Sequence, residues 1–144
     1  MTVQTIDKAT PELLEAVNRL LPQLSSSASA MTPEGLERFI SQPNVHLFVY
    51  TPDDDPNNIL GMLTLVIFHI PTGTRAWIED VVVSEETRGQ GAGRKLTEAA
   101  LEYANSLGTC TVDLTSRPSR EAANRLYQRV GFDKRNTNVY RYSC

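Results

Sequence analysis

The sequence contains no long run of apolar residues, only two cysteines and a small excess of negative charge. No stretch approaches the roughly 20 apolar residues that a membrane-spanning helix requires. The first residues lack the basic flank and apolar core of a signal peptide. The sequence therefore predicts a cytoplasmic protein without membrane contact. The formal net charge of −3 argues against general nucleic-acid binding.

The cysteines and histidines show no metal-ligand spacing. Cys110 and Cys144 could form at most one disulfide, and Cys144 is the last residue, so we expect a free thiol there. His46 and His69 stand alone on predicted strands, where histidine is more often structural than catalytic. The sequence thus predicts no metal centre, and its 144 residues suffice for one domain, 1–144.

The spacing of apolar residues predicts a sheet with flanking helices. Two helices each begin with Thr-Pro-Glu, in which Thr10 and Thr32 are expected N-caps. Short connections between consecutive strands predict an antiparallel meander, and a later helix between two strands predicts a parallel crossover. We expect a mixed α/β (α+β) domain. The predicted strands are 3–7, 45–51, 59–70, 75–83, 109–115 and 139–143, and the last two helices end at Gly108 and Gly131.

Three glycines at alternate positions, Gly89, Gly91 and Gly93, separate a predicted strand from a predicted helix. Each glycine in a regular element costs about 0.5–1 kcal/mol relative to alanine, so three require a reason. A helix N-terminus presents unpaired N–H groups that suit a phosphate, and glycines would leave those groups uncovered. Basic residues surround the same turn: Arg88, Arg94 and Lys95. The segment therefore predicts an anion-binding loop, with a flexible connection as the alternative.

Two nucleotide-binding motifs fit this segment poorly. A P-loop requires Gly-Lys-Ser/Thr, whereas Gly93 is followed by Arg94 and Lys95. A dinucleotide fingerprint counted from Gly89 would need glycine or alanine where Arg94 stands, although Asp113 lies at a plausible distance downstream. A nucleotide-binding protein is therefore the weaker alternative.

The segment RGQGAG at 88–93 resembles the Arg/Gln-x-x-Gly-x-Gly/Ala motif of the GNAT superfamily of acyl-CoA N-acyltransferases. The segment LYQRVGF at 126–132 resembles the second signature of that superfamily, a helix that carries tyrosine and ends in Gly-Phe. A predicted helix and a predicted strand separate the two, as in the superfamily. The resemblance implies a single-domain GNAT fold, with about four helices on both faces of a mixed sheet of about six or seven strands.

The resemblance also implies acetyl-CoA bound where strands 4 and 5 of the sheet, here 75–83 and 109–115, splay apart. Backbone groups of Val81 and Val83 would pair with the amides of the pantetheine arm. Asn124 is expected to contact the cofactor, because Arg120 occupies the position where many members have asparagine. The N–H groups expected to hold the pyrophosphate are those of Arg88, Gly89, Gln90, Gly91, Ala92, Gly93 and Arg94.

Direct acyl transfer to an amine requires a base for the amine and benefits from an acid for the leaving thiolate. Tyr127 matches the tyrosine that donates to the CoA sulfur, with a buried core tyrosine as the alternative. Glu79 is the candidate base, acting directly or through a water. Strict strand alternation would place Glu79 on one face with Val81 and Val83, and Asp80 on the other. Both acids could instead be structural.

The resemblance implies an acetyl-CoA-dependent N-acetyltransferase that moves an acetyl group to a primary amine of a small molecule or peptide. A catalytically inactive acyl-CoA-binding regulatory module is the alternative. Arg117 and Arg120 could bind an acidic group of the acceptor or of the cofactor, or simply cap a helix. Segment 9–42, where acceptor specificity would reside, shows no chemical signature. A homodimer is possible.

Overall fold

The structure is a computed structural model that describes every residue except Cys110. One five-stranded sheet has the order β1-β2-β3-β4-β5, with β1 to β4 antiparallel and β5 parallel to β4. The strands are β1 (Thr2–Ile6), β2 (Val45–Thr51), β3 (Gly61–Ile70), β4 (Gly73–Val83) and β5 (Thr111–Asp113). The helices are α1 (Pro11–Leu24), α2 (Pro33–Ile40), α3 (Ala92–Ser106) and α4 (Glu121–Val130), with a 3-10 turn, η1 (Glu85–Thr87), before α3.

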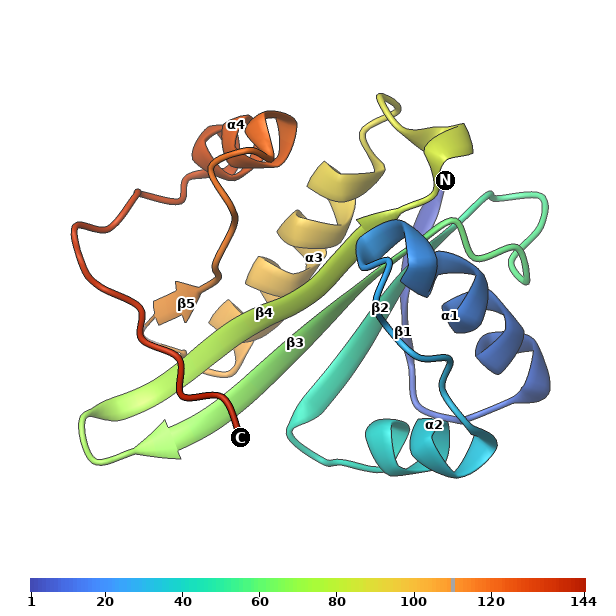
Figure 1. Cartoon of the computed structure of the whole chain (residues 1–144), viewed down its shortest axis with the longest axis horizontal. Helices are drawn as coiled ribbons and strands as arrows, with labels where there is room; N and C mark the ends of the chain where they lie inside the picture. The colour runs from blue at the N-terminus through green and yellow to red at the C-terminus, as the bar shows by residue number, and fades with distance from the viewer. Residues whose placement is uncertain (110) are drawn as a thin grey trace.

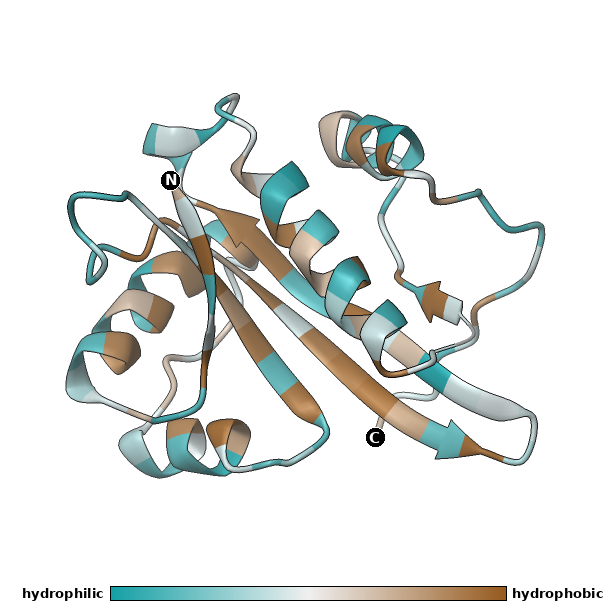
Figure 2. Ribbon diagram, turned by 180° about the vertical axis from the view of Figure 1, so that it is seen from behind, coloured by the Kyte–Doolittle hydropathy of each residue, from teal (hydrophilic) through white to brown (hydrophobic). Residues whose placement is uncertain are grey.

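The helices lie on both faces of the sheet, which confirms the predicted class (Figure 1). α1 and α2 cover one face, where Leu13, Leu20 and Leu36 pack against Leu47 and Val49 of β2. α3 covers the other face, seen in front of the sheet in Figure 2. There, fully buried side chains of α3 meet a second apolar cluster from β2, β3 and β4: Leu96, Ala100, Ala104, Phe48, Leu65 and Ile78.

Threonine side chains cap the N-termini of α1 and α2, as the sequence predicts. The Thr10 hydroxyl accepts a hydrogen bond from the Leu13 N–H at 3.1 Å, and the Thr32 hydroxyl accepts one from the Gly35 N–H at 3.0 Å. A proline follows each threonine at the first helical position, where its missing N–H costs nothing. These local signals fix where both helices begin.

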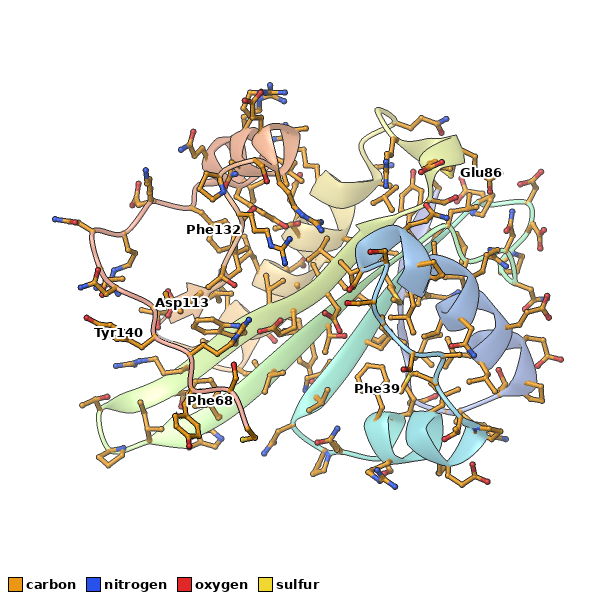
Figure 3. All side chains as sticks on the ribbon, viewed as in Figure 1. Phe39, Phe68, Glu86, Asp113, Phe132 and Tyr140 are labelled. Atoms are coloured by element: carbon orange, nitrogen blue, oxygen red, sulfur yellow. The ribbon has the colours of Figure 1, made fainter. Side chains whose placement is uncertain are left out.

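The predicted final strand at 139–143 does not form, so the sheet has five strands rather than six or seven. Val139 and Tyr140 are 71% and 88% exposed, and Tyr140 points away from the body of the molecule (Figure 3). A β-prone pattern becomes a strand only where a neighbouring edge supplies backbone partners. The adjacent edge strand β5 has three residues, fewer than the predicted 109–115, of which Cys110 lies outside the described residues.

Candidate active site

β4 and β5 are paired over only three residues of each strand. The pairs run from Arg75–Thr111 to Trp77–Asp113, after which the chain leaves the sheet toward α4. Within the described part of the chain, β4 therefore has no strand on this side from residue 78 to residue 83. This separation is the predicted splay between strands 4 and 5. It leaves backbone N–H and C=O groups for an extended ligand to pair with.

A β-bulge interrupts β4 in the same stretch. Met62 pairs with Val82 and Thr64 pairs with Glu79, so β4 has one residue more than β3 between these pairs. Asp80 in the bulge has φ +52°, the one positive φ outside glycine among the described residues. The extra residue shifts the alternation of side chains along β4.

The bulge corrects the face predicted for Glu79. Val81 and Val83 pack with the cluster beneath α3, whereas Val82 packs with the cluster beneath α1 and α2. Glu79 lies directly opposite Thr64, on the side of α1 and α2, because Thr64 in turn pairs with Leu47 of that cluster. The prediction that Glu79 shares a face with Val81 and Val83 is therefore wrong. The sequence could not reveal the extra residue.

The start of α3 is open, as the glycine pattern predicts. Gly91 is the N-cap residue with φ +82°, and no side chain caps the helix. Gly89 also has φ +82°, and at both positions a Cβ would meet nothing within 4 Å. Within the described residues, the N–H groups of Gly89, Gly91, Ala92, Gly93 and Arg94 have no backbone or side-chain acceptor. A helix start in this state binds anions.

Two amides predicted to hold the pyrophosphate already have partners within the loop. The Arg88 N–H donates to the Glu85 carbonyl at 3.4 Å, and the Gln90 N–H donates to the Thr87 carbonyl at 3.3 Å. Gly93 also differs from the other two glycines, because a Cβ there would lie 3.2 Å from Leu126 Cδ2 of α4. Gly93 thus allows α3 and α4 to approach each other, a role that the sequence pattern does not distinguish from phosphate access.

Two arginines carry positive charge beside the open helix start. Arg88 Nε donates to the Val83 carbonyl at 3.4 Å, at the end of β4. Arg94 forms an ion pair with Glu98 one turn further along α3, with Nε and Oε1 2.6 Å apart. Both side chains are exposed, so water screens this pair. Because Glu98 offsets the charge of Arg94, Arg88 is the stronger candidate for an anion.

Tyr127 lies on α4 with its ring edge-on to Phe132, ring centroids 5.8 Å apart. Gly131 ends the helix in the left-handed conformation at φ +116°, and the Phe132 N–H returns to the Tyr127 carbonyl at 2.9 Å. Burial raises the pKa of the Tyr127 hydroxyl above its ordinary value of 10.0, and the nearby charge of Arg120 partly opposes this. The phenol is therefore protonated at neutral pH, as a proton donor must be.

Asn124 and Arg120 hold the start of α4. Asn124 Nδ2 donates to the carbonyls of Arg117 and Arg120, both at 2.9 Å. Arg120 Nη2 donates at 3.1 Å to the carbonyl of Leu24, the last residue of α1. These contacts favour structural roles for Asn124 and Arg120, and the predicted roles in cofactor and acceptor binding stay predictions.

Trp77 joins the site, although the sequence analysis did not place it there. Its indole N–H donates to the Glu79 carboxylate at 2.6 Å. The signal available in the sequence was the separation of two residues along one strand, which puts both side chains on the same side.

No metal-binding group or membrane-crossing helix is found in the described residues. No cluster of three or more histidine, cysteine, aspartate or glutamate side chains there could hold a metal ion. None of the described helices is both long enough and apolar enough to cross a membrane.

Comparison with known proteins places this site in a family. The sequence model of the acetyltransferase (GNAT) family matches residues 12–132. The chain belongs to the acetyltransferase (GNAT) family. The glycine-rich segment and the Tyr127 helix both fall inside the matched range.

One curated relative is similar in sequence, and two solved structures share the fold. An N-alpha-acetyltransferase 30 from Schizosaccharomyces pombe is 36% identical over 74 residues, 51% of this chain and 49% of that protein, so the match spans about half of each. A solved protein from Agrobacterium tumefaciens shares the fold with a TM-score of 0.86 and 24% identity, covering 99% of this chain and 100% of the other. An aminoglycoside N-acetyltransferase solved in complex with CoA gives a TM-score of 0.80 at 17% identity, covering 99% and 95%.

Proposed function

We propose that this acetyltransferase moves an acetyl group from acetyl-CoA directly to a primary amine of a small molecule or peptide. One observation carries the proposal: the unpaired edge of β4 leads within a few residues to the open start of α3. A ligand with a chain of amides joined to a phosphate group would fit both. Acetyl-CoA has this composition, and the structurally similar aminoglycoside N-acetyltransferase was solved in complex with CoA.

The residues present fit this cofactor. Val81 and Val83 offer backbone groups to the pantetheine amides, on the stretch of β4 that β5 does not cover. The unpaired N–H groups around Gly91 would hold the diphosphate, because no side chain fills the space beside Gly89 or Gly91. Arg88 adds positive charge at the same turn, and Asn124 is a further predicted contact. When bound, acetyl-CoA supplies the activated acetyl thioester.

Glu79 and Tyr127 divide the proton transfers between them in this proposal. Glu79 accepts a proton from the acceptor ammonium, directly or through a water, so that the nitrogen can attack the acetyl carbon. Tyr127 donates the proton that the sulfur takes up when its bond to the acetyl group breaks, and the second proton lost by the nitrogen as the amide forms returns Tyr127 to its protonated state. The raised pKa of Tyr127 keeps this proton in place at neutral pH. Arg117 could contact an acidic group of the acceptor.

A thiol-release assay tests the proposal. The protein is incubated with acetyl-CoA and a panel of polyamines, aminoglycosides, amino acids, peptides and protein lysines, and free thiol is measured. Cys144 is exposed, so a Cys144→Ser variant lowers the background of protein thiol. We expect release that depends on at least one amine. Binding of CoA without release would support the inactive module instead, and no binding of CoA would contradict both readings.

A further inference from the structure

Trp77 and Glu79 form a hydrogen-bonded pair on β4. They are two residues apart along the strand, so both side chains lie on the face that α1 and α2 cover. The indole Nε1 donates to Glu79 Oε1 at 2.6 Å. A hydrogen bond to an ionised carboxylate is about twice as strong as one between neutral groups. The pair therefore joins an aromatic side chain to the proposed base.

Trp77 lies where the splay begins. It is the last residue of β4 that pairs on both sides, with Val66 of β3 and Asp113 of β5. Asp113 at the end of β5 is labelled in Figure 3. Glu79 pairs on one side only, with Thr64, and the bulge at Asp80 follows it directly. The indole N–H thus links the part of β4 that pairs on both sides to a carboxylate in the part that pairs on one side only.

The Glu79 carboxylate has few other restraints. Its side chain is exposed, and among the described residues it forms one hydrogen bond, the contact with Trp77, and no ion pair. An exposed glutamate on a strand samples several rotamers. The indole offers one N–H donor and no acceptor, so it fixes Oε1 without competing for the proton. The other oxygen, Oε2, is left to the amine.

We propose that Trp77 is a positioning residue that holds the Glu79 carboxylate toward the acceptor amine. This inference rests on the proposed function, because it requires Glu79 to take the proton. Removal of the indole N–H should slow the chemical step and leave cofactor binding unchanged, since the backbone groups around Val81 and Gly91 do not depend on it.

A double-mutant cycle tests the proposal, with Trp77→Phe, Glu79→Gln and the double variant. A fourth variant replaces Trp77 with benzothienylalanine, which keeps the two rings and exchanges the N–H for sulfur. We expect Trp77→Phe and the benzothienyl variant to lower kcat about tenfold, equivalent to about 1.4 kcal/mol. The KM for acetyl-CoA should change less than about twofold. In the Glu79→Gln background, removal of the N–H should cause no further loss.

Two controls separate positioning from a general effect on the fold. Phe68→Leu changes another aromatic residue of the β3–β4 hairpin, opposite Arg75, and should leave kcat unchanged. Trp77 is the single tryptophan of the chain, so its fluorescence reports this contact directly. The emission should change in Glu79→Gln without any substrate present.

The outcomes are distinct. Unchanged kcat in the benzothienyl variant, or losses that add fully in the double variant, would overturn the positioning role while leaving the proposed function intact. Full activity of Glu79→Gln would instead remove Glu79 as the base, and the positioning role would fail with it. In that case a change in emission would still report that the side chain of residue 79 lies beside the indole.

Discussion

The two halves of the molecule differ in how their backbone N–H and C=O groups are hydrogen-bonded. In the first half, from β1 to β3, side chains cap α1 and α2, and β2 is paired on both sides. In the second half, from β4 to α4, no side chain caps α3, and β4 has β5 beside it for three residues only. The two helix starts and β2 of the first half are thus hydrogen-bonded within the protein, whereas the start of α3 and the end of β4 leave donors and acceptors for a ligand.

This difference in hydrogen bonding affects the stability of the two halves. A threonine N-cap is worth about 1 kcal/mol, so α1 and α2 gain stability that α3 lacks. Asp80 in the bulge adds backbone strain to the second half, because a positive φ is unfavourable for a residue with a Cβ. The caps thus stabilise the helices of the first, closed half, and the proposed cofactor site lies in the second, open half. Four predictions test this division, from the largest expected effect to the smallest.

The largest effect should come from Tyr127→Phe in the open half. Loss of a general acid typically lowers the rate by about 100-fold or more, so we expect kcat to fall by about that factor, while the Kd for acetyl-CoA changes less than about twofold. Steady-state kinetics and calorimetric titration measure the two quantities. Tyr103→Phe is the matched control, because Tyr103 contacts His46 and Phe48 on β2. Unchanged kcat in Tyr127→Phe would exclude the acid role.

A pair of glycine variants tests the open start of α3. Gly91→Ala and Gly108→Ala each place a side chain at positive φ, +82° and +73°, in open space. Each should lose about 1–2 kcal/mol of unfolding free energy. Only Gly91→Ala should weaken acetyl-CoA binding, by about tenfold, because a Cβ there intrudes beside the unpaired N–H groups. Equal affinities of the two variants for acetyl-CoA would argue against this anion site.

The cap of α1 should show the converse behaviour. Thr10→Ala removes the acceptor for the Leu13 N–H and should lower the free energy of unfolding by about 1 kcal/mol. Affinity for acetyl-CoA should stay at the wild-type value, since the cap lies in the closed half. Urea unfolding measures the loss, and Thr10→Ser, which retains a hydroxyl acceptor, should restore most of it. A change in cofactor affinity would show that the halves are coupled.

The smallest effect concerns His46, whose ring packs at a tilt against Tyr103 with centroids 4.7 Å apart. Burial holds the pKa of His46 below its ordinary value of 6.5, so the unfolded chain binds a proton at a higher pH than the folded one. Its contribution to stability is thus present above pH 6.5 and is lost as the pH falls through the lowered pKa. As the pH falls from 6.5 through the lowered pKa, the melting temperature of His46→Gln should fall less steeply than that of the wild type. Parallel curves would refute the expectation.

Local signals in the sequence predicted much of this structure. The Thr-Pro pairs located the starts of α1 and α2, Gly91 located the open start of α3, and Gly131 located the end of α4. Each signal acts through a residue's own backbone angles or its nearest neighbours along the chain. The order of the strands and the splay followed from the connections and from the family resemblance.

Features that depend on a neighbouring segment were not predicted. The bulge at Asp80 requires a count of residues on both β3 and β4, and it moved Glu79 to the opposite face from Val81. The expected strand at 139–143 had the right pattern and no partner. Gly93 was predicted as part of an anion site, and the structure shows a second role that was not predicted: its missing Cβ makes room for Leu126 of α4.

By itself, then, the sequence determined where helices start and stop and which loop leaves its N–H groups unpaired. These properties arise from bond rotations and hydrogen bonds within a few residues. The tertiary structure alone decided which way Glu79 faces, that Trp77 donates a hydrogen bond to it, and that β5 stops after three residues. Such facts depend on register and contact between distant segments. The energies of these long-range contacts arise only when the whole chain has packed.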